Sequence, residues 1–488
     1  MLDFSSYIKE RTEHFTGREW VFKEVNDWLT KPPGDRRIFL LTGGPGTGKT
    51  AIAARLTQLN DDSVGEALAP ALRKGWLTHS HFCQAGLEST LSPLTFVQSI
   101  SETLANRYPA FRAALEKSGS RQIVINQNVG TVQDGGQVIG AQISQVQIEI
   151  KGGDARPLFD LAVRLPLEEL CKQLPAERIV ILVDSLDEAL TFNAENNITQ
   201  LLKLVNDFPP QARFFFTCRS NSDRVFNLVG PPTLDLIANA PSDVDDVRLY
   251  AAARLNTVPE TKRQVLADRV AEKSRGNFLY AFYVLKDLVL QGGDIENPDT
   301  LELPDELEDV YRKFIEREMA ANSTRWENAY RPLLGTIAVA RGEGLTKAQL
   351  IGITELPEDT ASDVLKVCAQ YLVGGDTKTD PYGVYHQSFR DFLLVDNGYP
   401  IFPAERHAAI ARYFQESTAQ TGAGVTINMP CATHQCIWLT LPLCPRPNAK
   451  RVRRHSSDSQ AVASINAALK PTSATCPCCM NTCTGPLW

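Results

Sequence analysis

The stretch LLTGGPGTGKTAIAARL, residues 40–56, joins an apolar run to a helical pattern through a glycine-rich turn. Residues 43–50 fit the pattern G-x-x-x-x-G-K-[ST]. Its glycines allow consecutive backbone N–H groups to turn inward around an anion, and the helix that follows adds the positive end of its dipole. The stretch therefore predicts a phosphate-binding loop between a buried strand and a helix.

The side chains of this loop indicate which ligand it holds. Lys49 is expected to reach the outer phosphates of a nucleotide, and Thr50 to supply a hydroxyl group to Mg²⁺. A glycine-rich turn with an incidental lysine is the alternative, but a strand and a helix flank the loop in the required order. We therefore expect ATP or ADP with Mg²⁺, held by Gly43, Gly44, Pro45, Gly46, Thr47, Gly48, Lys49 and Thr50.

The chain around the loop predicts an α/β sandwich over residues 36–240, behind an N-terminal segment of residues 1–35. Helical patterns alternate with short apolar runs, which are RIFLL (37–41), GWLTHSHFC (75–83), RIVILV (178–183) and ARFFFTC (212–218). Runs of such continuous apolar character are typical of strands buried on both faces of a parallel sheet.

One segment interrupts this alternation. Within residues 121–151, Val146, Ile148 and Ile150 alternate with polar residues, and Asp134-Gly135-Gly136 offers a tight turn. The pattern predicts a β-hairpin insertion. Its glutamine-rich strands could serve as a docking edge, whereas an inert surface ribbon is the commoner outcome for an insertion in a loop.

Beyond residue 240 the strand patterns stop and helical patterns continue. A helical domain is predicted over 241–300, with Ser242-Asp243 as its start signal and Gly292-Gly293 as its stop signal.

A second helix-rich block is predicted over 301–398. A capping box at 346–349 opens a short helix, a second helix runs from 359 to 371, and a polar two-stranded wing fits 374–385. This block is predicted to be a winged-helix domain.

An acidic cluster follows the run RIVILV. Asp184 comes directly after that strand, where it is expected to meet solvent and to hold the metal ion through water. Asp187 and Glu188 are candidates to orient or deprotonate an attacking water. An acidic helix start would also explain both residues. The phosphate-binding loop upstream favours the catalytic interpretation.

Two residues further along the chain are also candidates for the site. Arg219 follows ARFFFTC at the expected open edge of the sheet, where it could sense the outermost phosphate during catalysis; a surface arginine at a strand end is the alternative. His386 lies at a predicted helix start, and Phe389, Phe392 and Leu393 form the buried face of that helix. Its ring is thus free to donate a hydrogen bond, whereas a histidine that only caps the helix is the alternative.

The order and spacing of these motifs resemble the NACHT clade of signal-transducing NTPases, the STAND class, which is related to the AAA+ enzymes. The resemblance covers about residues 13–395 and is carried by FTGRE (15–19), DSLDE (184–188), TCR (217–219), GNFLYA (276–281) and HQSFRDFL (386–393). It implies an adenine pocket lined by Phe15, Gly17 and Arg18. It also implies a nucleotide contact near Phe278, where relatives often have proline, and a contact from His386 to the β-phosphate of ADP.

The resemblance implies a nucleotide-controlled switch. ADP would hold the α/β, helical and winged-helix domains closed, and exchange for ATP would open them for self-association, with slow hydrolysis as the reset and an effector protein as partner. A turnover ATPase that remodels protein or nucleic acid is the alternative. A DNA-binding regulator is disfavoured, because the candidate recognition helix carries Glu358, Asp359 and Asp363 at its start and only Lys366 as a basic residue, whereas phosphate contact needs clustered Lys and Arg.

Composition limits the partners further. The chain has 488 residues, 43% hydrophobic and 22% charged, with a formal net charge of -7, so its total charge does not attract nucleic acid or anionic lipid. The start MLDFSSYIKERTEHF lacks the features of a signal peptide, and no segment approaches the roughly 20 apolar residues that span a bilayer. A cytosolic location is therefore expected.

The remaining residues, 399–488, are expected to form a helical end and an irregular tail. From residue 431 onward the chain holds six basic residues against one acidic residue, and seven of the 11 cysteines. The basic residues could meet nucleic acid or a membrane surface, but solvated disorder is the commoner meaning of such a tail. The cysteines, with His434 and His455, are enough ligands for zinc, but no C-x₂-C pair recurs at finger-like spacing.

Overall fold

The computed structural model describes residues 2–440 with internal gaps, and every structural statement below concerns these residues. The gaps are 33–35, 61–68, 86, 119–120, 135–136, 194–195, 242–244, 291–297, 299–300, 321–322, 341–343, 376, 378, 396–398, 400, 422–425 and 431–435. The cysteine-rich basic tail, with its candidate zinc ligands, lies outside the described residues.

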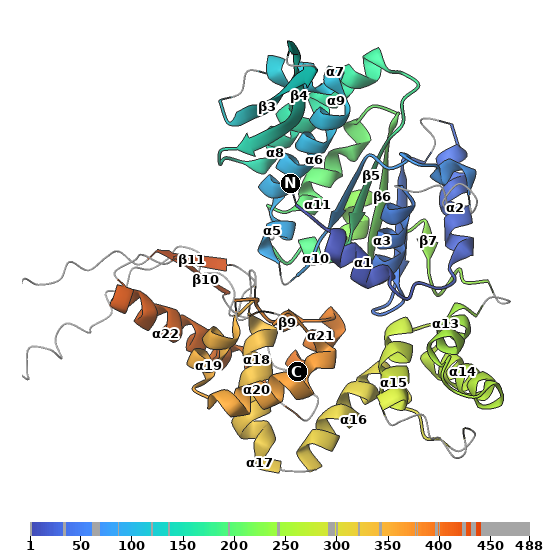
Figure 1. Cartoon of the computed structure of the whole chain (residues 1–488), viewed down its shortest axis with the longest axis vertical. Helices are drawn as coiled ribbons and strands as arrows, with labels where there is room; N and C mark the ends of the chain where they lie inside the picture. Colours follow the sequence, from blue (N-terminus) through green and yellow to red (C-terminus); the bar gives the residue numbers. More distant parts are fainter. Residues whose placement is uncertain are drawn as a thin grey trace, which may run out of the picture. The chain divides into compact units, whose positions relative to one another are not determined.

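A parallel sheet of five strands forms the first half of the chain (Figure 1). Its strands lie in the order β2-β5-β6-β1-β7. They are β1 (Ile38–Gly43), β2 (His79–Phe82), β5 (Ile179–Asp184), β6 (Ala212–Arg219) and β7 (Leu234–Asp235). The α/β fold and four of its strands were predicted, and β7 is an addition of two residues at the sheet edge.

The apolar strands are buried because helices cover both faces of the sheet. Phe214 and Phe216 of β6 point into one core, and Phe215 between them points into the other. The first core packs against α6 (Pro93–Arg107), α7 (Pro109–Lys117) and α9 (Leu165–Gln173), and the second against α2 (Glu19–Thr30) and α3 (Lys49–Leu59). Alternate side chains of one strand therefore serve two cores, which explains the continuous apolar runs.

The strand order brings three chain ends to the same edge of the sheet. β6 lies between β1 and β5, and Gly43 at the end of β1 stands in register with Arg219 at the end of β6. Asp184 ends the next strand, β5. The carboxyl ends of parallel strands meet at one edge, so the phosphate-binding loop, Arg219 and Asp184 are neighbours.

Helix α1 (Ser5–Thr12) lies in the N-terminal segment, for which no helix was predicted. It packs against α3, and its flanking Phe4 contacts the ring of Phe82 with centroids 5.3 Å apart. The sequence SSYIKERT is mostly polar, so its apolar periodicity is too weak to indicate a helix.

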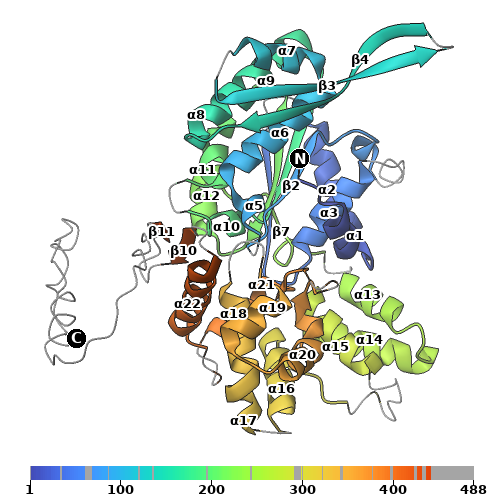
Figure 2. The ribbon, with the colours of Figure 1, turned by 60° about the vertical axis from the view of Figure 1, so that its left-hand side comes forward.

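The predicted hairpin insertion is present. Strands β3 (Ile123–Asp134) and β4 (Gln137–Ile150) pair antiparallel and run alongside α6 (Figure 2). Val146 and Ile148 are buried as their alternation predicted, and the Asn106 side chain hydrogen bonds to both backbone groups of Val146. The predicted turn residues Gly135-Gly136 lie outside the described residues.

Three helices follow the sheet, as expected for the helical segment: α13 (Asp246–Arg254), α14 (Glu260–Ser274) and α15 (Phe278–Leu290). The first of them is capped by Asp245, whose side chain accepts a hydrogen bond from the Arg248 N–H. The predicted start and stop signals, 242–243 and 292–293, lie outside the described residues.

The next block combines helices with a short antiparallel ribbon. The capping box predicted at Thr346 and Gln349 is present at the start of α19, and β8 pairs with β9. The predicted helix 359–371 ends earlier, because α20 stops at Val367 and a 3₁₀ turn follows. The elements are α16 (Leu307–Ala320), α17 (Ser323–Arg325), α18 (Arg331–Val339), α19 (Lys347–Thr354), α20 (Glu358–Val367), β8 (Leu372–Val373), β9 (Gly383–Val384), α21 (Gln387–Leu394) and α22 (Pro403–Thr421).

Residues after α22 differ from the expectation of irregular chain. β10 (Thr426–Pro430) and β11 (Cys436–Thr440) pair antiparallel, although CATHQCIWLT shows no strand alternation. The shorter elements elsewhere are η1 (Pro70–Leu72), α5 (Glu88–Leu91), α8 (Ala155–Phe159), η2 (Asp160–Arg164), α10 (Leu186–Ala189), α11 (Ile198–Leu202), η3 (Lys203–Asp207), α12 (Asp223–Val229), η5 (Trp326–Tyr330) and η6 (Ala369–Tyr371).

Two absences hold for the part of the chain that the structure describes. None of its helices combines the length and apolar character needed to cross a membrane. Among these described residues, no cluster of three or more histidine, cysteine, aspartate or glutamate side chains could hold a metal ion.

Candidate functional site

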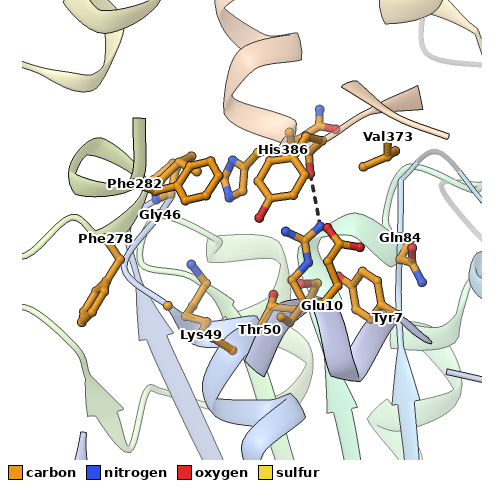
Figure 3. A pocket seen from close by; sticks show the side chains of 18 of the residues that line it. Tyr7, Glu10, Gly46, Lys49, Thr50, Gln84, Phe278, Phe282, Val373 and His386 are labelled. Carbon is orange, nitrogen blue, oxygen red and sulfur yellow. Dashed lines mark hydrogen bonds between the residues drawn. The ribbon is translucent and has the colours of Figure 1, made fainter. Parts of the chain in front are cut away.

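A cavity of about 630 Å³ lies at the carboxyl edge of the sheet. Its lining comes mainly from helix α1 and the FTGRE segment, the phosphate-binding loop with α3, the residues at or after the ends of β2, β5 and β6, the start of α15, and the residues around His386. Figure 3 shows His386 on the opposite side of the cavity from Lys49 and Thr50, and Tyr7 and Glu10 of α1 on the same side as Thr50. The cavity is therefore enclosed by segments far apart in the sequence.

The phosphate-binding loop has the backbone conformation that its glycines predict. Gly46 and Gly48 have φ angles of 76° and 95°, in the left-handed region that favours glycine. The ammonium group of Lys49 donates hydrogen bonds to the carbonyl oxygens of Gly43 at 2.8 Å and Gly44 at 2.9 Å. Burial lowers the pKa of Lys49, while Asp187 and Asp184 favour its charged form.

The start of α15 is bound directly to this loop. The backbone N–H groups of Phe278 and Leu279 donate to the carbonyl oxygen of Gly46 at 2.9 and 3.2 Å, and the Asn277 side chain donates to the carbonyl of Pro45. A Cβ atom on Gly46 would lie 2.3 Å from Oδ1 of Asn277. The motif GNFLYA thus reaches the loop by backbone contact, which its sequence alone did not reveal.

The FTGRE segment ties the loop to α13. Arg18 is 5% exposed, and its guanidinium donates to the carbonyl of Thr47 at 2.9 Å and lies 3.6 Å from Oδ2 of Asp246. Gly17 has a φ of 74°, and a Cβ there would lie 2.2 Å from Oδ1 of Asp246. Arg18 therefore lines the cavity, and its hydrogen bonds connect the phosphate-binding loop to α13.

Asp184 is more deeply buried than predicted. Its carboxyl group is fully inaccessible and accepts hydrogen bonds from Thr217 Oγ1 at 2.6 Å and Ser185 Oγ at 3.0 Å. Burial raises its pKa, and the nearby Thr217, Thr50, Ser185 and Lys49 oppose that rise. The carboxyl group does not meet solvent at the strand end, because Thr217, Ser185 and Thr50 surround it.

Asp187 and Glu188 both line the cavity, at the start of the short helix α10. The preceding Ser185 has a φ of 57°, so the chain turns sharply after the strand. Glu188 accepts a hydrogen bond from the Ala85 N–H at 2.6 Å. Burial, followed by the charge of Asp187, raises the pKa of Glu188 to about 8. A carboxyl group with this pKa is suited to exchange protons near neutral pH.

Arg219 connects two parts of the chain. Its Nε lies 3.2 Å from Oδ2 of Asp187, and its Nη1 lies 2.9 Å from Oδ2 of Asp391 on α21. The arginine at the end of β6 is therefore not a free surface residue, because it links the sheet edge to the helix that His386 caps.

His386 combines both roles that the sequence left open. Its Nδ1 accepts a hydrogen bond from the Ser388 N–H at 3.1 Å, so it caps α21, and the ring also lines the cavity. Burial lowers its pKa to about 3, with further contributions from the positive charges of Arg11, Lys49 and Arg219. The ring is thus neutral, and since Nδ1 accepts, Nε2 carries the proton.

The structure gathers most of the predicted site residues around this cavity and leaves five outside its lining. Those that line it are Phe15, Arg18, Pro45, Gly46, Gly48, Lys49, Thr50, Asp187, Glu188, Arg219, Phe278 and His386. Those that do not line it are Gly17, Gly43, Gly44, Thr47 and Asp184. Of these, Thr47 and Asp184 have buried side chains.

Sequence reasoning missed several lining residues. Tyr7, Glu10 and Arg11 come from α1, and Gln84 and Ala85 follow β2. The position of Gln84 and Ala85 directly after a predicted strand was the one available signal, because such residues reach the carboxyl edge of the sheet. No sequence pattern indicated α1.

The residues present fit a nucleotide with Mg²⁺. The cavity volume lies within the range of about 300–1,000 Å³ that is usual for small-ligand sites. Lys49, Arg219, Arg11 and the Nε2–H of His386 offer donors to phosphate, and Thr50 and Asp184 are oxygen ligands of the kind that Mg²⁺ prefers.

A family comparison supports this assignment. Residues 17–135 match the model described as the N-terminal part of nephrocystin 3, which is NACHT-related. The match includes the segment after Phe15 and the whole phosphate-binding loop. It confirms the resemblance to NACHT-clade P-loop NTPases for this part of the chain. Among curated proteins, no match to the chain is found.

Solved structures show more distant likenesses. A Walker-type ATPase from Pyrococcus abyssi is 14% identical, with a TM-score of 0.35 and coverage of 78% of this chain and 97% of that one. A STAND protein with a tetratricopeptide repeat sensor from Pyrococcus horikoshii is 12% identical, with a TM-score of 0.37 and coverage of 83% and 45%. A RuvB mutant from Thermotoga maritima is 12% identical, with a TM-score of 0.25 and coverage of 79% and 94%. The chain thus spans less than half of the STAND protein.

Proposed function

We propose that this protein is a nucleotide-controlled switch that binds ATP or ADP with Mg²⁺ in the described cavity. The bound nucleotide sets how three parts of the chain pack: the sheet, the helical segment α13–α15, and the block from α16 to α21, called the C-terminal block below. The observation that carries this proposal is the lining of one cavity by all three, through Lys49, Phe278 and His386. A ligand that touches several parts of a chain favours the arrangement in which all its contacts form.

The residues proposed to hold the ligand divide by chemistry. The loop amides and Lys49 bind the phosphates, and Thr50 and Asp184 hold Mg²⁺, directly or through water. Bound Mg²⁺ would neutralise phosphate charge and polarise the terminal phosphate group. Phe15 and Phe278 provide apolar surface for the adenine base. The neutral His386 donates from Nε2 to a phosphate oxygen.

Hydrolysis is proposed to be slow. Glu188 is the candidate base: its raised pKa makes its ionised form a stronger base than an ordinary glutamate, and only a minority of the group is ionised at neutral pH, which fits slow hydrolysis. Its Oε2 already accepts the Ala85 N–H, and Asp187 is paired with Arg219. These contacts compete with water and phosphate for both carboxyl groups and for Arg219, which supports a switch more than a fast enzyme.

We also propose a winged-helix assignment for residues 301–398. The paired short helices α19 and α20, followed by the ribbon β8–β9, support it. The first turn of α20 holds Glu358 and Asp359, and its last turn holds Lys366 alone as a basic residue, which disfavours contact with DNA phosphates. Self-association in the ATP state, an effector protein as partner and a cytosolic location complete the proposed function.

A turnover ATPase that remodels protein or nucleic acid is the second candidate. It uses the same cavity and differs in rate and in stimulation by a substrate. Steady-state turnover above about one per second would favour this candidate, because that rate is ordinary for enzymes.

The test of the proposal is nucleotide binding by the full chain and by Lys49→Ala. Removal of the ammonium group is expected to weaken ATP and ADP binding at least about 100-fold, because a buried charge-assisted contact is lost. Lys74→Ala, an exposed lysine after the η1 turn, serves as the matched control. ATP affinity of Lys49→Ala equal to that of the unmodified chain would refute the proposal.

A further inference from the structure

Helix α1 is fixed against the sheet-bearing part of the chain. Phe4 is 9% exposed and contacts the rings of His81 and Phe82 with centroids 5.6 and 5.3 Å apart. The Gln58 side chain of α3 donates to Thr12 Oγ1 at 2.6 Å. α1 is therefore held at both ends, and its residue Arg11 has a defined position.

Arg11 lines the cavity and contacts the residues around His386. Its Nη2 donates to the backbone carbonyl of Tyr385 at 3.2 Å, and its guanidinium carbon lies 4.6 Å from the centre of the Tyr385 ring. On the other side, the same carbon lies 5.0 Å from the centre of the Tyr7 ring. The charge of Arg11 is thus close to His386, the next residue after Tyr385.

The hydrogen bonding of Arg11 is incomplete. Its Nε is buried and has no hydrogen-bond partner among the described residues. Its hydrogen bond to Tyr385 has a neutral acceptor and a length at the upper end of the ordinary range. In a hydrogen bond from arginine to phosphate both partners are charged, whereas a backbone carbonyl is neutral, and arginine–phosphate pairs are often bidentate. A phosphate group in the cavity is thus a better acceptor for this guanidinium than the Tyr385 carbonyl.

We propose that Arg11 recognises the terminal phosphate of a bound nucleoside triphosphate, and that it gives up the Tyr385 carbonyl when it does so. This inference rests on the proposed nucleotide site. The loop amides, Lys49 and Thr50 hold the phosphates and the metal ion from the loop, whereas Arg11 lines the cavity from α1 and contacts Tyr385, the neighbour of His386. Loss of this hydrogen bond releases the backbone of Tyr385, which precedes His386. Binding of the third phosphate thereby removes a contact between α1 and the C-terminal block.

The test measures equilibrium binding of a fluorescent nucleoside diphosphate and of a non-hydrolysable triphosphate to the full chain. Arg11→Ala is expected to lose about 10- to 100-fold in triphosphate affinity, the range for a hydrogen bond to a charged group, and less than about threefold in diphosphate affinity. Lys9→Ala removes the same charge from an exposed position on α1 and is expected to match the unmodified chain. An equal loss for both nucleotides, or no loss for either, would overturn the proposal.

Two further variants separate the possible failures. Arg11→Gln keeps a polar side chain and replaces Arg11→Ala if the latter does not fold; the same selective loss for the triphosphate is expected. If Lys49→Ala binds both nucleotides as tightly as the unmodified chain, the proposed site itself is wrong. If binding depends on Lys49 but the ratio of triphosphate to diphosphate affinity does not depend on Arg11, only the role of Arg11 is wrong.

Discussion

The guanidinium group of Arg219 lies 2.9 Å from the carboxylate of Asp391, which joins the end of β6 to helix α21 across 172 residues of sequence. The same arginine also pairs with Asp187. A phosphate that attracts Arg219 would compete with Asp391, so this ion pair is a direct link between the nucleotide site and the C-terminal block.

Asp391→Asn tests this link. Asp391 is 41% exposed, and an ion pair of this exposure contributes about 1 kcal/mol or less. A diphosphate has no third phosphate to draw Arg219 away, so the pair then holds α21 against the sheet edge. Loss of the pair is expected to make diphosphate release about two- to fivefold faster, measured by displacement of a fluorescent diphosphate in stopped flow. Asp287→Asn is the control, because Asp287 is 42% exposed and pairs with Arg317 away from the cavity. Equal acceleration in both variants would contradict a specific role for Asp391.

Glu188→Gln tests the assignment of the catalytic base. The amide keeps the size of the side chain but cannot take a proton, so hydrolysis is expected to fall about 100-fold or more while ATP affinity changes little. Phosphate release and binding are measured on the same preparation. Glu169→Gln alters an exposed carboxylate on α9, outside the lining of the cavity, and is expected to keep the hydrolysis rate. Unchanged hydrolysis in Glu188→Gln would exclude this residue as the base.

Gly46→Ala tests the contact between the loop and α15. The new Cβ would lie 2.3 Å from Oδ1 of Asn277 and 2.7 Å from Cβ of Leu279, and the residue also has a positive φ. Gly152→Ala shares the positive φ but meets no atom within 4 Å, so it carries the backbone strain alone, about 1 kcal/mol. Gly46→Ala is expected to lower the melting temperature more than Gly152→Ala, and it alone is expected to lower nucleotide affinity.

Acid is expected to destabilise the sheet through two buried histidines. Burial lowers the pKa of His79 to about 3 and of His81 to about 4, whereas both titrate near 6.5 in the unfolded chain. The unfolded state therefore binds more protons below pH 6.5, and stability falls as pH falls toward 4. The two residues together reduce the free energy of unfolding by about 3 kcal/mol between pH 7.5 and 5.5.

The measurement for this prediction is the melting temperature as a function of pH. His79→Asn with His81→Gln should show a weaker loss of stability between pH 6.5 and 5.5 than the unmodified chain. A pH dependence that is the same in both proteins would show that other groups cause the acid sensitivity.

The sequence predicted those features that depend on local pattern. The glycine spacing of residues 43–50 indicated the loop, and continuous apolar runs such as 212–218 indicated strands buried on both faces. The capping box at Thr346 was equally local, because its two hydrogen bonds join residues three apart.

The sequence did not predict contacts that only the packing creates. Helix α1 is mostly polar in sequence, and β7 has two residues, so neither has a usable periodicity. The pairing of Arg219 with Asp391 and of Arg11 with Tyr385 depends on how the C-terminal block meets the sheet. No short motif encodes that arrangement, since each partner comes from a distant part of the chain.

The most direct test of the central claim is the nucleotide content of the purified protein, combined with its mass in solution. Mass spectrometry of the released small molecules is expected to identify tightly held ADP, and light scattering after exchange for ATP with Mg²⁺ is expected to show a larger mass, with neither result in Lys49→Ala. Protein that holds no nucleotide and does not bind added ADP or ATP would contradict the account.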